Sequence, residues 1–338
     1  ATGGTIVNGN GSSSVTVDWN TAGPATVALW YEETSVTADT VCFGISDTLY
    51  VTLSPVPNTS AITGSTASCI NDTIPFNVIN TTGSTYSWTI TGGSVLSGNT
   101  TNAINAIWTA AGTAVVSVTE TNSFGCTGSP VTYNVTINPL PIVSAGSNAT
   151  ICFGDSTNLT ATGGINYNWT PSTGLDNSTI ANPIAFPQST TLYTVYVTDG
   201  NGCENNASVT VFVNPLPIVT AGSNTAICIG SSTTLNAGGA TTYVWTPATG
   251  LSDPLIGNPV ANPTSTTTYT VVGTDQNGCH NSSSVLVTVN PLPTAVAGND
   301  TLLCNGNAVA LSASGGTQYQ WTPATGLSNP NIANPLAS

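Results

Sequence analysis

The sequence contains no lysine, no arginine and one histidine, against fourteen aspartate and glutamate residues. A chain without cationic side chains cannot neutralise phosphate groups, so nucleic acid and anionic membrane surfaces are excluded as partners. No apolar run reaches the roughly 18 residues of a membrane-spanning helix, so we expect no membrane insertion. Few groups remain for acid–base chemistry, and no carboxylate pair recurs. We therefore predict that the chain is not an enzyme and has no catalytic or cofactor-binding residues.

Strand-forming residues dominate what is present. Helix formers such as lysine, arginine, methionine and glutamate are absent or rare, whereas threonine and valine are abundant. Apolar residues alternate with polar ones in short runs that Gly, Pro and Asn interrupt, and this pattern predicts strands with one buried face. We expect an all-β protein.

An internal repeat organises most of the chain. Asn-Pro-Leu-Pro begins at Asn138, Asn214 and Asn290, which gives a period of 214 − 138 = 76 and again 290 − 214 = 76. The same spacing separates Trp169, Trp245 and Trp321, and it also separates the cysteines. A more divergent copy follows Pro57. We therefore predict five parts, each linked by prolines that favour short extended connections: 1–57, 58–138, 139–214, 215–290 and 291–338.

Each full repeat has the size of a two-sheet sandwich. Leu159 and Ala161 alternate with polar residues, as do Tyr193, Val195 and Val197. Several such strands within about 80 residues predict an immunoglobulin-like β-sandwich. Residues 1–57 align with the second half of a repeat and 291–338 with the first half, so the two ends could complete each other between molecules. A window from a longer repetitive chain would look the same.

The sequence from Tyr243 to Leu251, with Thr268 to Val271 and Asp275 to Cys279, resembles the PKD-like and Ig-like repeats of large cell-surface proteins of the Bacteroidota. The resemblance implies a tandem array of PKD-like β-sandwiches, secretion by the type IX route and a role in adhesion or gliding. It also implies O-glycosylation at the pattern Asp, then Ser or Thr, then an aliphatic residue or Thr. The candidate sites are Thr40, Thr48, Thr73, Ser156 and Thr301.

We predict no metal or cofactor. Calcium is the ion that the chain would most readily accept, because Asp199, Asn201, Asp275 and Asn277 supply oxygen ligands. The same residues are also good turn formers.

The eight cysteines predict disulfides and an oxidising, extracellular location at the cell surface. Two pairings are open. The intradomain pairing joins Cys69 with Cys126, Cys152 with Cys203, and Cys228 with Cys279. The interdomain pairing joins Cys152 with Cys279 and Cys69 with Cys203. We favour the second, because the first turn and the last hairpin of a sandwich lie at opposite ends, whereas bonded Cα atoms must come within about 7 Å.

The short rigid linkers and the period favour a structural protein, namely a stalk, fibre or adhesin shaft, whose partners are other copies of itself or neighbouring domains of a longer chain. One alternative is an adhesive module that binds glycans or another cell. Another is a set of accessory domains of a secreted hydrolase. Exposed aromatic rings recurring from repeat to repeat would favour adhesion.

Overall fold

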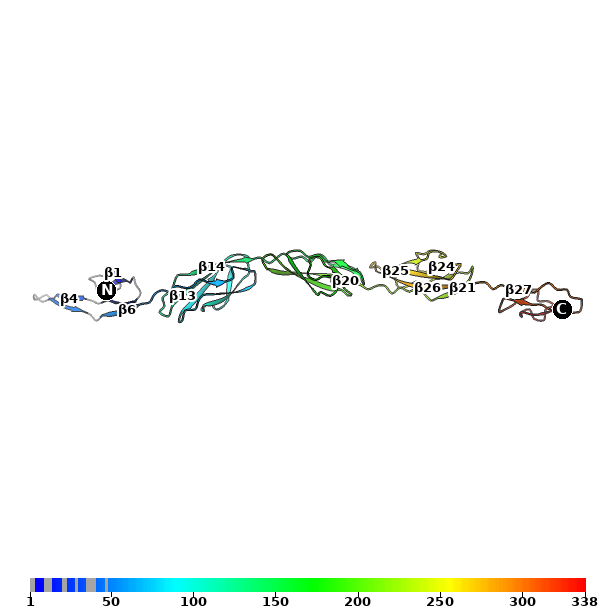
Figure 1. Cartoon of the computed structure of the whole chain (residues 1–338), viewed down its shortest axis with the longest axis horizontal. Coiled ribbons are helices and arrows are strands. Elements are labelled where there is room, and N and C mark those ends of the chain that lie inside the picture. Colours follow the sequence, from blue (N-terminus) through cyan, green and yellow to red (C-terminus); the bar gives the residue numbers. More distant parts are fainter. Residues whose placement is uncertain (1–3, 9–13, 20–22, 28–29, 35–40, 46–47) are drawn as a thin grey trace.

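A computed structural model covers the 338-residue chain. It describes every residue except 1–3, 9–13, 20–22, 28–29, 35–40 and 46–47, and for some strand residues before position 45 it describes the backbone alone. The described residues form strands and turns, with no helix among them. They are arranged in a long row of small β-structures, with β4 (Trp30–Thr34) and β1 (Gly4–Asn8) at one end and β27 (Val296–Ala297) near the other (Figure 1).

Sandwich I, formed by β7 to β14, packs two four-stranded sheets face to face, in the orders β10-β13-β14-β8 and β11-β12-β9-β7. Tyr86, Trp88 and Trp108 fill its core. They come from strands whose buried and exposed residues alternate, as period-two patterns require. Its strands are β7 (Thr63–Gly64), β8 (Ala67–Cys69), β9 (Thr73–Asn77), β10 (Thr85–Ile90), β11 (Gly93–Ser97), β12 (Ala103–Trp108), β13 (Gly112–Thr121) and β14 (Val131–Asn138).

Sandwich II has a four-stranded sheet, β15-β20-β19-β17, and a two-stranded sheet, β16-β18. Its core surrounds Trp169, which is 1% exposed and donates its Nε1–H to the carbonyl of Ile180 at 3.0 Å. Its strands are β15 (Ala149–Cys152), β16 (Thr157–Asn158), β17 (Asn166–Thr170), β18 (Ile184–Ala185), β19 (Thr191–Thr198) and β20 (Glu204–Asn214).

Sandwich III repeats this arrangement one period later, with the sheets β21-β26-β25-β23 and β22-β24 around Trp245. Its strands are β21 (Thr225–Cys228), β22 (Thr233–Thr234), β23 (Thr242–Thr246), β24 (Val260–Ala261), β25 (Thr267–Thr274) and β26 (His280–Asn290). The expected all-β array of immunoglobulin-like sandwiches is confirmed.

Among the described residues, the strands at the two ends of the chain form two-stranded pairings. The N-terminal segment, residues 1–57, contains β1 (Gly4–Asn8), β2 (Thr16–Trp19), β3 (Gly23–Val27), β4 (Trp30–Thr34), β5 (Val41–Ile45) and β6 (Leu49–Leu53). The C-terminal segment, residues 291–338, contains β27 (Val296–Ala297), β28 (Val309–Ala310), β29 (Ala313–Ser314) and β30 (Leu336–Ala337).

One pairing decides where the sandwiches can be linked. In each of the three sandwiches the first cysteine-bearing strand runs parallel to the last strand: β8 to β14, β15 to β20 and β21 to β26. Cys152 is therefore in register with Asn214, and Cys228 with Asn290. The first turn of each sandwich consequently lies at the end from which the chain leaves for the next sandwich.

Candidate functional site: the bridged joints between sandwiches

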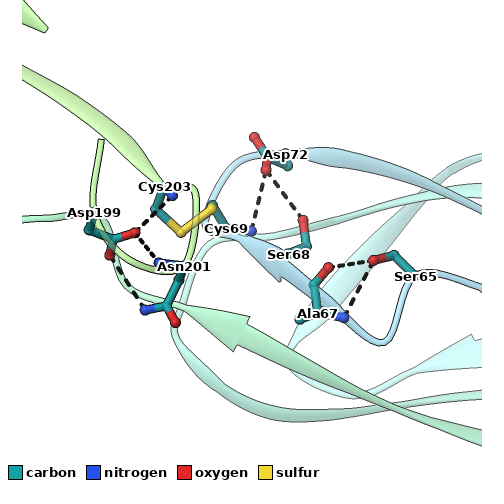
Figure 2. Close-up of a disulfide and its surroundings, with 8 residues drawn as sticks. All are labelled: Ser65, Ala67, Ser68, Cys69, Asp72, Asp199, Asn201 and Cys203. Atoms are coloured by element: carbon teal, nitrogen blue, oxygen red, sulfur yellow. Dashed lines mark hydrogen bonds between the residues drawn. A yellow bond between two sulfur atoms is a disulfide. The ribbon is translucent and has the colours of Figure 1, made fainter. Parts of the chain in front are cut away.

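The first half of each joint is a turn at the exit end of a sandwich. In sandwich I, Cys69 ends β8, and the next amide, that of Ile70, donates to the carbonyl of Asn138 at 3.1 Å. Asp72 closes the turn. Its amide donates to the carbonyl of Cys69 at 3.2 Å, and its Oδ2 accepts from the amide of Cys69 and the hydroxyl of Ser68, both at 3.3 Å (Figure 2). The sulfur of Cys69 is thus held beside the linker that leaves sandwich I after Asn138.

The second half of each joint is the hairpin between the last two strands of the following sandwich. Between β19 and β20, the amide of Asp199 donates to the carbonyl of Cys203 at 2.9 Å. The Oδ1 of Asp199 accepts from the amides of Asn201 at 2.8 Å and Cys203 at 2.9 Å (Figure 2). The amide of Cys203 is the main reason why the pKa of Asp199 lies below its ordinary value of 3.8, because hydrogen bonds favour the charged carboxylate.

A disulfide connects the two halves at both joints between complete sandwiches. Cys69 of sandwich I is bonded to Cys203 of sandwich II, and Cys152 of sandwich II is bonded to Cys279 of sandwich III. The Cα atoms are 5.5 Å apart in both bonds. Cys203 and Cys279 are fully buried. The hairpin cysteine of each bond is therefore shielded from solvent.

The structure thus brings together the two pairs of the interdomain hypothesis and none of the intradomain pairs. Cys69 is not bonded to Cys126, Cys152 is not bonded to Cys203, and Cys228 is not bonded to Cys279. The reason is the length of the last strand. In sandwich II, β20 has 11 residues. At about 3.3 Å per residue, it separates the hairpin from the exit turn by roughly 30 Å or more.

The linkers are also held by side chains of the following sandwich. Asn205 on β20 donates its Nδ2–H to the carbonyl of Pro141 at 3.0 Å, and Asn281 on β26 donates in the same way to Pro217 at 3.2 Å. These two asparagines were not predicted from the sequence. A signal was available, because an asparagine stands two positions after the hairpin cysteine in both repeats. Each joint therefore has a covalent bond and an anchored linker.

Three cysteines with described side chains are free: Cys126, Cys228 and Cys304. Cys126 is in the hairpin of sandwich I, in the position that Cys203 occupies in sandwich II, and its Sγ lies 3.6 Å from the carbonyl of Ser54. Cys228 and Cys304 follow Cys152 by one and two periods, and both are exposed. Each free cysteine therefore occupies one half of a joint of the kind described above.

The other residues singled out from the sequence lie apart from one another. Of the proposed glycosylation sites, Thr48, Thr73, Ser156 and Thr301 are exposed, and Thr40 lies outside the described residues.

The residues considered for calcium lie in the two hairpins. There the Oδ1 of Asp275 accepts from the amides of Asn277 at 2.8 Å and Cys279 at 2.9 Å, as Asp199 does in sandwich II. Within the described part of the chain, no three His, Cys, Asp or Glu side chains gather as metal ligands would. The described residues also contain no helix that is long and apolar enough to cross a membrane.

Comparison with known proteins gives a family for one part of the chain. Residues 55–136 match the model of the PKD-like domain family. No curated protein matches the sequence.

The solved structures that match this chain include proteins with several extracellular or Ig domains in a row. Extracellular domains 3–5 of Drosophila OTK match at 10% identity, over 70% of this chain and 98% of that chain, with a TM-score of 0.28. The N-terminal eight Ig domains of Down Syndrome Cell Adhesion Molecule match at 15% identity, over 93% of this chain and 62% of that chain, with a TM-score of 0.28. The insect immune protein hemolin is similar at 11% identity, over 82% of this chain and 94% of that one, with a TM-score of 0.27. The matched residues contain nearly all of sandwich I, which is therefore similar to a PKD-like domain.

Proposed function

We propose that the chain is an extracellular structural protein whose sandwiches form a stiff shaft, as a stalk, fibre or adhesin stem at the cell surface. The observation that carries this proposal is the repeated joint, in which an exit turn is bonded to the hairpin of the next sandwich. At both joints between complete sandwiches, a linker and a disulfide connect the neighbours at two points, and two connections oppose bending more than one does. Disulfides also persist in oxidising compartments outside the cytosol.

The proposal includes the parts expected from the sequence, with domain limits at 1–57, 58–138, 139–214, 215–290 and 291–338. It also includes O-glycosylation at the exposed sites Thr48, Thr73, Ser156 and Thr301. Secretion by the type IX route of the Bacteroidota, which the resemblance implies, belongs to the same proposal.

The surface favours a shaft over an adhesive module. Sandwich II exposes four aromatic rings, those of Phe153, Phe186, Tyr196 and Phe212. One period later these positions hold Ile229, Asn262, Val272 and Thr288. A glycan-binding platform repeated along the array would need aromatic rings at matching positions. The accessory-domain alternative has no feature in its favour among the described residues.

Small-angle scattering of the oxidised and reduced chain tests the shaft. Oxidised protein should give a single extended species with a narrow distribution of end-to-end lengths. Reduction should broaden that distribution, because only the linker and its asparagine contact then fix each joint. A length distribution that is already broad before reduction, or one that reduction leaves unchanged, would contradict the proposal.

A further inference from the structure

The two strands of the parallel pair in sandwich II end side by side and are continued in different ways. β20 ends at Asn214 and continues as the linker into sandwich III. β15 ends at Cys152, opposite Asn214, and continues through its disulfide to Cys279 of sandwich III. Two covalent connections therefore leave sandwich II together, one from each strand of the pair.

These two connections change strands at the next sandwich. The disulfide arrives at Cys279, directly before β26, which is the last strand of sandwich III. The linker leads instead to β21, the strand that pairs with β26 and ends at Cys228. The joint between sandwiches I and II is built in the same way, because Cys69 at the end of β8 is bonded to Cys203, directly before β20 (Figure 2).

Two covalent paths consequently run along sandwiches I to III. Path 1 follows β14, the linker and β15 to Cys152, crosses to Cys279 and continues along β26. Path 2 follows β8 to Cys69, crosses to Cys203 and continues along β20, the linker and β21. The parallel pairs β8·β14, β15·β20 and β21·β26 hold the two paths to each other. Each sandwich therefore contributes one strand to each path.

Further hydrogen bonds attach the two paths at both ends of a parallel pair. In sandwich II, the amide of Phe153 donates to the carbonyl of Asn214 at 2.9 Å, directly after β15. Before β15, the Oδ1 of Asn148 accepts from the amide of Thr210 at 2.8 Å. Sandwich III has both contacts one period later. The attachment between the paths is therefore longer than the paired strands alone.

Tension along the shaft pulls the two paths in opposite directions. A pull on the linker before sandwich I enters path 2, because this linker leads to β8, and a pull on the linker after sandwich III enters path 1, because this linker continues β26. The tension therefore crosses between the paths through the parallel pairs. The hydrogen bonds of a β-ladder run from strand to strand, so sliding one strand along the other strains them together. Because the disulfides make each path continuous, all three pairs share the tension.

The disulfides also limit how far the array can lengthen. Cys69 and Cys279 are separated by 279 − 69 = 210 residues of backbone. Through the two disulfides, the shortest covalent route between them is the backbone from Cys203 to Cys152, and 203 − 152 = 51 residues. Complete unfolding therefore releases the length of 51 residues between Cys69 and Cys279 and no more.

We propose that the two disulfides give the shaft a second function, which is to resist stretching along its axis. While the sandwiches are folded, the three parallel pairs share the tension. Once these pairs separate, the route of 51 residues limits the extension. A stalk or adhesin stem that is pulled from both ends needs both properties. This inference deepens the proposed shaft and rests on it.

Single-molecule force spectroscopy of the 338-residue chain, held by a peptide tag at each end, tests the limit on extension. Cys152→Ser combined with Cys279→Ser leaves the route from Cys203 to position 279, which is 279 − 203 = 76 residues. The fully extended chain should therefore lengthen by 76 − 51 = 25 residues, or about 85 Å at roughly 3.4 Å per residue. Complete reduction should add 210 − 51 = 159 residues, or about 540 Å. Cys228→Ser removes a free cysteine and should add nothing.

The opening steps in the same experiment test whether the tension is shared. The oxidised chain should open sandwiches I to III in one step, because the three parallel pairs separate together. In the variant without Cys152 and Cys279, tension reaches β26 through sandwich III alone. Its first opening at constant force should be about 10-fold faster or more, since each hydrogen bond that no longer shares the tension is worth roughly 2- to 10-fold.

Separate opening steps for the three sandwiches of the oxidised chain would overturn this inference, as would equal extension with and without the bond between Cys152 and Cys279. Either result would leave the shaft intact, because scattering measures its shape without tension. Non-reducing peptide mass spectrometry should find both disulfides in the protein that is pulled, and their absence would overturn the inference and the shaft together. If the serine variant fails to fold, reduction of the unmodified chain provides the comparison.

Discussion

Sandwich III and the C-terminal segment begin with nearly the same sequence and end in different structures. Trp245 donates its Nε1–H to Ile256 at 3.0 Å, and Trp321 donates to Ile332 at the same distance. Local hydrogen bonds therefore form in both. The strand that carries Trp245 forms only in sandwich III, because there β25 pairs with it. The difference shows that the local sequence sets the turns, whereas a strand needs its neighbour.

The largest effect should come from the two tryptophans. Trp245→Ala should destabilise sandwich III by about 3–5 kcal/mol, as removal of a buried large aromatic side chain does. Trp321→Ala should cost much less in the monomeric chain, because Trp321 is only partly buried. Denaturant unfolding, followed by hydrogen exchange in sandwich III and in the C-terminal segment, measures the two losses of stability. Equal costs in the monomer would show that the C-terminal segment already has a closed core.

The joint disulfide should have the next largest effect. Cys152→Ser combined with Cys279→Ser should lower the stability of the joined sandwiches by about 2–4 kcal/mol, since a disulfide restricts the unfolded chain. Cys228→Ser is the control, because this exposed cysteine is free in the single chain. Calorimetry at concentrations where the chain is monomeric compares the two. A loss of the same size in the control would mean that Cys228 is paired.

Substituting an equivalent glycine should destabilise sandwich III and the C-terminal segment by the same amount. Gly239 and Gly315 have φ values of +87° and +92°, and an added Cβ would clash with the carbonyl oxygens of Ile218 and Thr294. Alanine at either position should cost about 1–3 kcal/mol of local stability. Hydrogen exchange at nearby amides measures this loss of local stability. Gly200→Ala is the control, because an added Cβ at Gly200 meets open space. An effect at Gly239 alone would mean that the paired strands of the C-terminal segment are not formed.

The smallest expected effect is a pH dependence of stability in the hairpin between β19 and β20. The pKa of Asp199 lies below 3.8, chiefly because the amide of Cys203 donates to its carboxylate. A lowered pKa in the folded state means that this contribution to stability is present above 3.8 and is lost as the pH falls through the folded value. Carboxyl NMR titration should show Asp199 changing protonation below 3.8, and Asp199→Asn should remove this pH dependence of the hairpin. A titration at or above 3.8 would contradict the hydrogen-bond geometry.

Much of the fold was predictable because it depends on local patterns. Alternation in Tyr193, Val195 and Val197 predicted a strand with one buried face, and all three are fully buried. The period predicted that Trp169 and Trp245 would occupy equivalent cores, and both are 1% exposed. The asparagines that hold the linkers, Asn205 and Asn281, were not predicted. Their recurrence two positions after the hairpin cysteine marks the positions, but spacing along the chain does not show which carbonyl each side chain contacts.

By itself, the sequence determined the all-β class, the 76-residue period and the side chains that each strand buries, because these depend on residue preferences and spacing along one strand. Only the tertiary structure decided between the two cysteine pairings. Cys152 lies 51 residues from Cys203 and 127 from Cys279, since 203 − 152 = 51 and 279 − 152 = 127, yet it bonds to the more distant one. The choice depends on which ends of neighbouring sandwiches meet. The parallel pairing of β15 with β20 sets that arrangement in space, and distance along the chain does not.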